Sequence, residues 1–295
     1  MTPVRSAISI VVVNWNSGDY LRANLDAIFA HMPPAGWDLT VVDNRSTDGS
    51  DRCALERGPA CRLVRNPRNL GFGAAVNRGV ACTDGDFVLI MNPDCRLEAG
   101  AAQTLAAVLE QEPDCAIAAP RLLDTDGGVQ GSARGDPNLL TGIFGRSSRL
   151  TRLFPRSAPA RRNVRAADLA DAGRVAHVDW VSGACMLARR SALAAIGGFD
   201  ERYFLYWEDA DLCRRLRAAD LTVRYVPDAR VRHAAGVSSR HARGAAVRAF
   251  HASAFLYYAT HVAPGRWDPR RWLAWAVLRA RCAWLLGRLA LAGSS

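Results

Sequence analysis

Three carboxylates stand within four residues at Glu208, Asp209 and Asp211, directly after an aromatic run that begins at Tyr203 and ends at Trp207. A carboxyl group that is partly desolvated by aromatic side chains has a raised pKa and can act as a general base near neutral pH. Acidic residues in the first turn of a helix are also stabilised by the helix dipole, so ordinary capping is the alternative. The aromatic surround favours chemistry, and we predict that this segment carries the base of an enzyme.

A second pair of residues could bind a divalent cation. Asp94 follows the apolar stretch LIM at 89–91, and His233 ends a strand-like segment at 222–233. A carboxylate oxygen and an imidazole nitrogen form a mixed ligand set that suits Mn²⁺ or Mg²⁺ held partly by substrate phosphates. A lone histidine is more often a surface or hydrogen-bonded residue, so the two support a metal site only if the fold joins them.

The first 120 residues alternate strand and helix signals. The run ISIVVVNWN at 8–16 is apolar almost to its end, which is typical of a parallel strand covered on both faces. This alternation predicts a mostly parallel sheet with a binding crevice outside the carboxyl ends of its strands. Asn14, Asp43 and Asp94 each stand at such an end, so we expect them to share a site. The other predicted strands are 38–44, 61–66 and 86–94, and the predicted helices follow Ser17-Gly18-Asp19, open within 69–83 and span about 98–111.

The composition indicates a folded protein with anionic partners. The chain has 295 residues, 49% of them hydrophobic, and a formal charge of +10 that comes from arginine alone, because the sequence contains no lysine. A pI near 9.7 favours phosphates, acidic lipid headgroups or nucleic acid as partners. The eight cysteines form no C-x-x-C pair, as expected of reduced core thiols, and no window offers the ~20 apolar residues of a spanning helix. We therefore expect a cytoplasmic protein.

The strand and helix pattern weakens between residues 131 and 176. This stretch mixes arginines with glycines and prolines, and it is much longer than the usual connection of about 4–6 residues. It is either a mobile, solvated insertion or a lid on the acceptor side of a site. The pattern resumes at 177–193, which predicts a strand and the start of a helix, and at 222–233, which predicts a strand.

Two helices are predicted after the sheet domain, at 245–262 and 268–291. Helices that are rich in tryptophan and flanked by arginine can lie in a membrane interface. Leu273, Val277 and Trp284 on the opposite face weaken the amphipathic pattern, so packing against the catalytic domain or a second subunit is the alternative. We expect either an anionic membrane surface or a homodimer contact here. The apolar face of the second helix consists of Trp272, Trp275, Leu278, Cys282, Leu285 and Leu289.

The chain contains seven blocks in a fixed order: VVVNWN, VVDNRSTDGS, RNLGFGAAVNRG, MNPD, WVSGACMLARRSAL, GGFDERYFLYWEDADLCRRL and VPDARVRH. In this order they resemble the inverting family 2 glycosyltransferases of GT-A fold, particularly their bacterial rhamnosyltransferase-like branch. The resemblance covers about residues 7 to 235. It implies an α/β, Rossmann-like, mostly parallel sheet flanked by helices in a catalytic domain over 1–235. Residues 131–176 would be a variable acceptor-side insertion, and 236–295 a C-terminal helical appendage.

The resemblance also implies roles for individual residues. Asp209 would be the catalytic base, and Asp94 and His233 would hold a divalent cation, Mg²⁺ or Mn²⁺, at the donor diphosphate. Asp94 stands where the family has its D-x-D motif, but Asn92 replaces the first carboxylate, so tight metal binding without nucleotide is not expected. Asp43 would contact the base or ribose of the nucleotide. The residues implied in substrate binding are Asn14, Asp43, Asn69, Asn77, Asn92, Trp180, Gly183, Trp207 and Glu208.

The implied function is inverting transfer of a sugar, with dTDP-rhamnose as the favoured donor. The implied acceptor is a glycan or a polyprenyl-linked glycolipid in bacterial surface polysaccharide synthesis, at the inner face of the cytoplasmic membrane. Hexose, galactofuranose and UDP-linked donors stay open, because no residue reads the sugar unambiguously. A nucleic-acid-binding module, suggested by the arginines at 146–165, lacks the interleaved aromatics of such modules, and we expect no nucleic acid partner. A dinucleotide-dependent oxidoreductase is a third alternative, but GFGAAVNRG does not match G-x-G-x-x-G.

Overall fold

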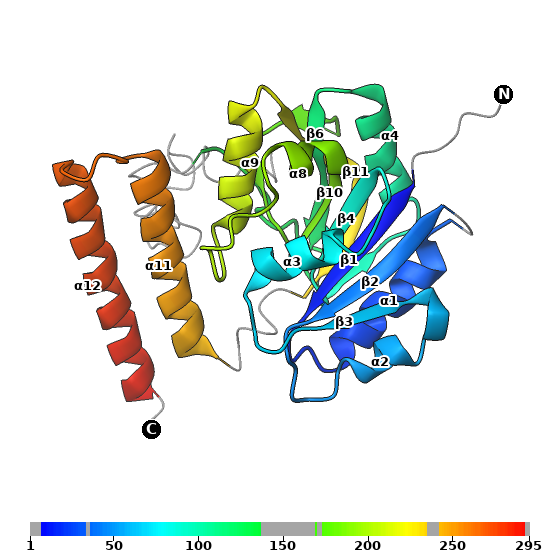
Figure 1. The fold of residues 1–295 in the computed structure, drawn as a ribbon, viewed down its shortest axis with the longest axis horizontal. Helices are drawn as coiled ribbons and strands as arrows, with labels where there is room; N and C mark the ends of the chain where they lie inside the picture. Colours follow the sequence, from blue (N-terminus) through cyan, green and yellow to red (C-terminus); the bar gives the residue numbers. More distant parts are fainter. Residues whose placement is uncertain (1–6, 34–35, 137–168, 170–172, 235–241, 293–295) are drawn as a thin grey trace.

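The computed structural model describes residues 7–33, 36–136, 169, 173–234 and 242–292. In this part of the chain the main feature is a nine-stranded sheet in the order β3-β2-β1-β4-β10-β6-β11-β5, with β8 beside β11 (Figure 1). A separate two-stranded sheet pairs β7 (Ala133–Arg134) with β9 (Trp180–Val181). The strands of the large sheet are β1 (Ile8–Asn14), β2 (Trp37–Asp43), β3 (Arg62–Arg65), β4 (Phe87–Met91), β5 (Cys95–Leu97), β6 (Cys115–Leu123), β8 (Ala176–His177), β10 (Cys185–Arg189) and β11 (Thr222–His233).

Six of the nine strands in the described part of the large sheet run in one direction, as the alternation of strands and helices predicted, and the other three make the sheet mixed. β3, β2, β1 and β4 run parallel to one another, and β6 runs parallel to β11. β10 lies antiparallel between β4 and β6, while β5 and β8 lie antiparallel against β11. The antiparallel strands bring loops from both halves of the chain to the carboxyl ends of β1, β2 and β4.

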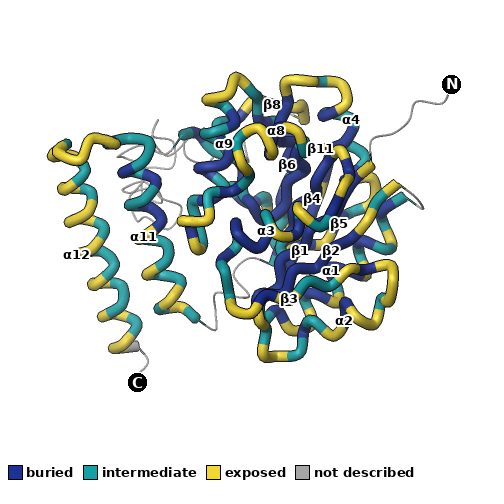
Figure 2. The backbone as a smooth tube through the Cα atoms, in the orientation of Figure 1, coloured by how far each residue is buried: buried dark blue, intermediate teal, exposed yellow. Residues whose placement is uncertain are grey.

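Helices cover both faces of the sheet, so alternate residues of a strand enter two different cores. Ile10 and Val12 of β1 pack with α1, α2 and α4, whereas Val11 and Val13 pack with α3, α8 and α9. This double burial explains the continuous apolar run of β1, and the sheet is the darkest part of Figure 2. The helices are α1 (Asp19–His31), α2 (Arg52–Leu55), α3 (Phe72–Val80), α4 (Ala101–Gln111), α8 (Arg190–Ala195), α9 (Glu208–Ala218), α11 (Arg243–His261) and α12 (Pro269–Ala292).

The last two helices form an antiparallel pair beside α9. α11 lies next to the acidic segment, which is the stretch from Tyr203 to Asp211 that carries Glu208 and Asp209. α12 lies outside α11 at the edge of the molecule (Figure 1). α11 buries His251, Ser253 and Tyr257, whereas α12 is mostly exposed (Figure 2). None of the helices in the described ranges has both the length and the apolar character that crossing a membrane requires.

Two predicted strands end earlier than expected. The run at 8–16 leaves the sheet at Asn14, because Asn16 adopts a left-handed backbone with φ of 47°. The run at 86–94 ends at Met91, and residues 92–94 form a turn into the antiparallel β5. All eight cysteines are free thiols, and six of them are buried. Most of the predicted insertion at 131–176, including the arginines at 146–165, lies outside the described residues.

Candidate active site

Asn14 and Asp43 lie side by side at the carboxyl ends of β1 and β2. They are partners in the parallel register, and the Asn14 Nδ2 donates to Asp43 Oδ1 over 2.8 Å. The Asp43 carboxylate also accepts from the backbone N–H and the hydroxyl of Ser46. Both side chains are buried, with at most 2% of either exposed. They hold the loop after β2 in place, at the sheet end where the nucleotide is expected.

The glycine-bearing loop at the start of α3 touches the acidic segment. Asn69 Oδ1 accepts from the Gly71 N–H over 2.9 Å, and Phe72 N donates to the Phe204 carbonyl over 3.0 Å. Gly71 has a φ of 89°, and an added Cβ would lie 2.3 Å from the Phe204 oxygen. Only glycine allows this approach, so the loop meets the aromatic run.

Asn77 lies one turn further along α3 and does not join this contact. Its Nδ2 donates to the Phe199 carbonyl and to Glu201 Oε1, and its Oδ1 accepts from the Phe199 N–H. Both ends of the amide therefore hold the 199–201 turn. Although Asn77 was predicted to bind substrate, its contacts are those of a residue that stabilises the fold.

Asp94 and His233 are brought together by the antiparallel pairing of β5 with β11. His233 is in register with Cys95, and its Nε2 lies 3.3 Å from Asp94 Oδ1. Both residues are almost buried, with 8% of Asp94 and 9% of His233 exposed. Among the described residues, Asp94 Oδ1 is a buried atom that accepts no hydrogen bond. A buried, unsatisfied carboxylate oxygen facing an imidazole nitrogen matches the donor set of a divalent cation.

Gln130 orients the histidine, and sequence reasoning missed it. Its Nε2 donates to Asp124 Oδ1 over 2.6 Å and to the His233 carbonyl over 2.8 Å, so its Oε1 must face His233 Nδ1 at 2.8 Å. Nδ1 therefore donates to Gln130, and Nε2 is the ring nitrogen that faces Asp94. Outer hydrogen bonds of this kind fix the tautomer of metal-binding histidines. The segment GGVQGS carries no local signal for this role, because Gln130 and His233 are 103 residues apart.

Cys95 lies close enough to form a group with Asp94 and His233, since one ligand atom from each falls within 4.8 Å of the others. Burial raises the pKa of the Cys95 thiol well above its ordinary value, with smaller effects from Cys185 and Asp94. The thiol donates to the Ala184 carbonyl over 3.1 Å. Since the thiolate is the metal ligand and Mg²⁺ prefers oxygen, Cys95 belongs to the core, not to the ligand set.

The three carboxylates of the acidic segment have different surroundings. Asp209 is half-buried, and its Oδ2 accepts from the Gly183 N–H over 2.9 Å. Glu208 is 6% exposed, and its Oε2 has no hydrogen-bond partner within the described residues. Burial, followed by the charge of Asp209, raises the pKa of Glu208 well above its ordinary value, and burial also raises the pKa of Asp209. Asp211 turns away to bind Arg215 and His261 over 2.7 Å each.

Gly183 and Ala184 connect the acidic segment to the cation-binding pair. The Gly183 N–H donates to Asp209, and the carbonyl of the following residue, Ala184, accepts from the Asn92 N–H over 2.8 Å. Asn92 opens the turn that contains Asp94, so the proposed base and the proposed metal ligands flank one short stretch of chain. Trp180 lies on the same connection, donates through Nε1 to the Gly135 carbonyl and carries Arg134 over its ring at 4.8 Å. Trp207 packs instead against Phe250 and Tyr257 of α11.

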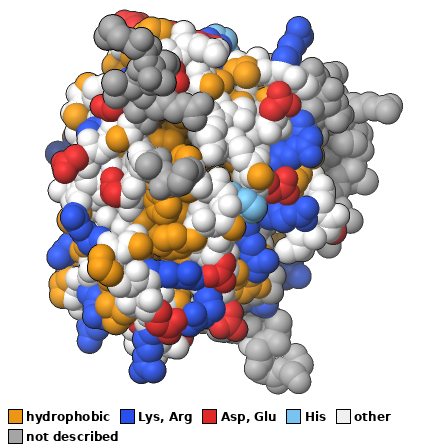
Figure 3. Space-filling view, turned by 90° about the vertical axis from the view of Figure 1, so that its right-hand side faces the viewer, with side chains coloured by type: hydrophobic (Ala, Val, Ile, Leu, Met, Phe, Trp, Pro, Cys, Tyr) orange, Lys and Arg blue, Asp and Glu red, His pale blue; other side chains and the backbone are white. Residues whose placement is uncertain are grey.

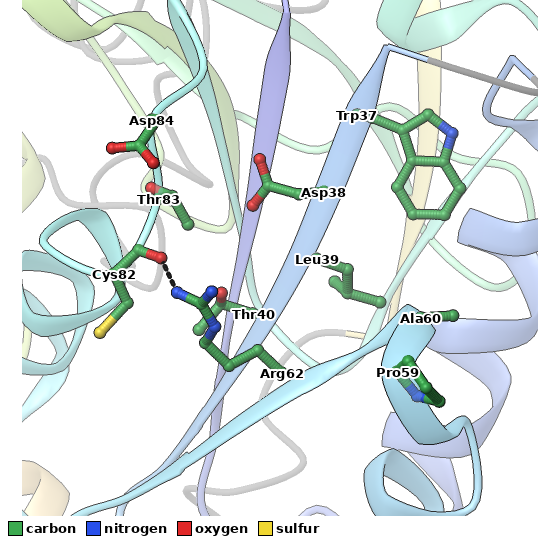
Figure 4. A pocket seen from close by; sticks show the side chains of 10 residues that line it. All are labelled: Trp37, Asp38, Leu39, Thr40, Pro59, Ala60, Arg62, Cys82, Thr83 and Asp84. Atoms are coloured by element: carbon green, nitrogen blue, oxygen red, sulfur yellow. Dashed lines mark hydrogen bonds between the residues drawn. The ribbon is translucent and has the colours of Figure 1, made fainter.

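A surface cavity of about 380 Å³ lies elsewhere. It is lined by Trp37 and Asp38 at the amino end of β2, by Arg62 at the start of β3 and by Asp84 before β4 (Figure 4). The polar residues described above follow the carboxyl ends of β1, β2 and β4. The cavity therefore lies at the amino ends of the strands, at the opposite end of β2 from Asp43.

Comparison with known proteins identifies the family and the fold. Residues 9–197 match the model of glycosyl transferase family 2. Over 284 residues, which are 90% of each chain, the protein is 34% identical to the N-acetylglucosaminyl-diphospho-decaprenol L-rhamnosyltransferase of Mycobacterium tuberculosis. Among solved structures, GalNAc-T7 with UDP, GalNAc and Mn²⁺ matches with a TM-score of 0.60 at 14% identity, over 78% of this chain and 44% of that one.

The mannosyltransferase PcManGT of Pyrobaculum calidifontis, in complex with GDP-Man and Mn²⁺, matches with a TM-score of 0.58 at 19% identity, over 98% of this chain and 74% of that one. At these identities the two structures establish the fold, which is the GT-A fold expected from the sequence blocks. The family match covers more than half of the chain. The protein belongs to glycosyl transferase family 2 and is a glycosyltransferase of GT-A fold.

Proposed function

We propose that this glycosyltransferase moves L-rhamnose, with inversion at the anomeric carbon, from dTDP-rhamnose to a hydroxyl group of a lipid-linked sugar. The observation that carries the proposal is that Gly183-Ala184 contacts both Asp209 and Asn92, which begins the turn that contains Asp94 of the Asp94–His233 pair. The choice of sugar and acceptor is supported by the relative that is 34% identical over 90% of both chains, whose name gives L-rhamnose as the sugar and a decaprenyl diphosphate-linked sugar as the acceptor. Such an acceptor would bring the enzyme to the inner face of the cytoplasmic membrane.

In this proposal Asp94 Oδ1 and His233 Nε2 would hold the cation. Their 3.3 Å separation leaves two electron-rich atoms facing each other in a buried position. When bound, a divalent cation would offset the charge on the departing diphosphate. Since Asn92 contributes no second carboxylate, oxygens of the donor diphosphate would supply further ligands.

The residues of the chain then act on the acceptor. Asp209 takes the proton of the acceptor hydroxyl while that oxygen forms the new bond to the anomeric carbon. The bond from that carbon to the dTDP oxygen breaks, dTDP leaves with the electron pair, and the proton stays on the carboxylate. The N–H groups of Gly183 and Ala210 each donate to one oxygen of Asp209, which fixes the direction of the carboxylate. Asn14 and Asp43 support the loop that would hold the nucleotide.

A donor panel tests this function. The purified full chain is incubated with Mn²⁺ and a polyprenyl-diphosphate-linked N-acetylglucosamine, together with dTDP-rhamnose, UDP-glucose or UDP-galactofuranose. Mass spectrometry is expected to show the gain of one deoxyhexose from dTDP-rhamnose alone. A higher kcat/KM with either UDP-sugar would overturn the donor and keep the reaction class.

A further inference from the structure

The outward face of α12 is apolar along most of its length. Its exposed, uncharged residues include Trp272, Leu273, Trp275, Ala276, Val277, Ala280, Ala283, Trp284 and Leu291. The helix packs on α11 through its other side, where Leu286 approaches Gly244 and Arg271 donates to the Ala259 carbonyl. Contiguous exposed apolar surfaces mark interaction sites.

This finding changes which face of α12 is available. Of the apolar face predicted from the sequence, Leu278, Cys282, Leu285 and Leu289 are only partly exposed, on the side towards α11. The residues that weakened the predicted pattern, Leu273, Val277 and Trp284, lie on the outward side and are 57–64% exposed. Packing on α11 therefore uses one apolar stripe, and a second stripe is left for another occupant.

The charge around this face selects the occupant. Residues 242–292 contain eight arginines and a single acidic residue, Asp268, which is bound by Arg270 over 2.7 Å. Arg279 and Arg288 lie over the rings of Trp275 and Trp284 at 5.3 and 5.1 Å. On the side of the molecule away from α12, by contrast, arginine and acidic side chains are intermixed (Figure 3).

A second copy of the chain does not fit this surface. Two α12 helices packed together would bring the arginines of both copies into proximity, and neither α11 nor α12 offers a carboxylate to pair with them. Acidic lipid headgroups supply many negative charges beside an apolar layer, and tryptophan prefers that boundary.

We propose that the outward face of α12 docks on an anionic lipid surface, with Trp272, Leu273 and Trp284 in the headgroup boundary and Arg279 and Arg288 on lipid phosphates. The purpose of this docking rests on the proposed function, because a lipid-linked acceptor would be presented at the same lipid surface. α11 joins this face to the site, since Ser253 of α11 donates to the Leu205 carbonyl beside Trp207.

The test measures sedimentation of the purified full chain with vesicles, in the absence of donor and acceptor. The wild type is expected to bind phosphatidylglycerol-phosphatidylcholine vesicles, to bind pure phosphatidylcholine weakly and to lose binding as salt rises. The double variant Trp272→Ser and Trp284→Ser is expected to bind about tenfold more weakly or worse, because the buried apolar area sets the strength of interfacial binding. Leu55→Ser, which changes an exposed leucine on α2, is the matched control and should bind like the wild type.

Circular dichroism melting of each variant separates loss of binding from loss of folding. Equal binding by the double variant and the wild type, or no binding by the folded wild type, overturns the proposal. A concentration-dependent dimer that the double variant abolishes, without vesicle binding, would assign the face to a second copy instead. Because no sugar is transferred in this assay, its failure leaves the proposed reaction untouched.

Discussion

Glu208 and Asp209 are neighbours in the first turn of α9, but their surroundings affect the pKa values of the two carboxyl groups differently. Burial raises the pKa of both carboxyl groups, and the effect is larger for Glu208, which lacks the hydrogen bonds that Asp209 receives from Gly183 and Ala210. Burial therefore favours the neutral form of Glu208, whereas the two hydrogen bonds favour the ionised form of Asp209, which makes Asp209 the better base of the pair.

This difference predicts distinct effects of two isosteric changes. Asp209→Asn should lower kcat by about 10²–10⁴-fold, the usual contribution of a positioned base, whereas Glu208→Gln should retain most of the turnover because the neutral acid and the amide have the same charge. A base acts only when ionised, so kcat/KM of the wild type should rise with pH through the raised pKa of Asp209, above the ordinary value of 3.8. The measurements are steady-state kinetics from pH 5 to 9, with Asp220→Asn at the exposed end of α9 as the control. Equal losses from both changes would remove the distinction.

Gln130 makes a second prediction at the residue scale. Gln130→Met removes the acceptor for His233 Nδ1, so the histidine loses its fixed tautomer and Mn²⁺ should bind about 10–100-fold more weakly in the presence of dTDP. Electron paramagnetic resonance of free Mn²⁺ measures this affinity directly. Gln111→Met, at the exposed end of α4, is the matched control. Unchanged Mn²⁺ affinity in a folded Gln130→Met variant would show that His233 needs no such support.

At the scale of elements, α11 holds the acidic segment in a strained shape. Tyr206 and Trp207 both have left-handed backbones, with φ of 66° and 70°, which costs about 1–3 kcal/mol for each residue. The strain is held by Ser253, which donates to the Leu205 carbonyl over 2.9 Å, and by the Trp207 ring on Tyr257. At the end of the helix His261 binds Asp211. We therefore propose that the catalytic unit extends past the expected boundary at 235 and includes α11.

Ser253→Ala tests this role of α11. The change removes the hydrogen bond to the partly buried Leu205 carbonyl, at a cost of about 0.5–1.5 kcal/mol, and kcat should fall by up to about tenfold if this cost appears in the reaction barrier. Hydrogen exchange at 203–209 should become faster in the variant. Ser191→Ala on the exposed surface of α8 is the control. Normal kcat with normal exchange protection would mean that the acidic segment keeps its shape without α11.

At the scale of the whole molecule, donor and cation should stabilise the fold together. The site joins loops after β1, β2 and β4 to β11, so a ligand that bridges them binds the folded state only. At 100 times its Kd such a ligand adds about 2.7 kcal/mol, or a Tm increase of about 4 °C for a chain of 295 residues.

The predicted measurement is a thermal melt with dTDP, with Mn²⁺ and with both. The increase should be largest with both ligands, it should fall when EDTA is added, and His233→Asn should lose the Mn²⁺-dependent part. Turnover should be lost in EDTA and restored by excess Mn²⁺. An EDTA-resistant turnover would contradict a role for Asp94 and His233 in holding a cation.

The sequence by itself determined the fold class, and it predicted residues on both sides of the candidate site. Apolar runs buried on both faces specify parallel strands, and Asn14 and Asp43 follow directly from where those runs stop. The carboxylates of the acidic segment were also visible, because their spacing is local. These features depend on neighbours in the chain, which periodicity records.

Only the tertiary structure decided which residues meet across long separations. The direction of β10, the contact of Gln130 with His233 over 103 residues and that of His261 with Asp211 over 50 residues follow from packing between elements. The exposed side of α12 was likewise decided by its packing against α11. Because α12 has apolar residues on more than one face, its sequence does not determine which face packs against a neighbour. Local patterns describe what a segment can bury, and the assembled fold determines against what it is buried.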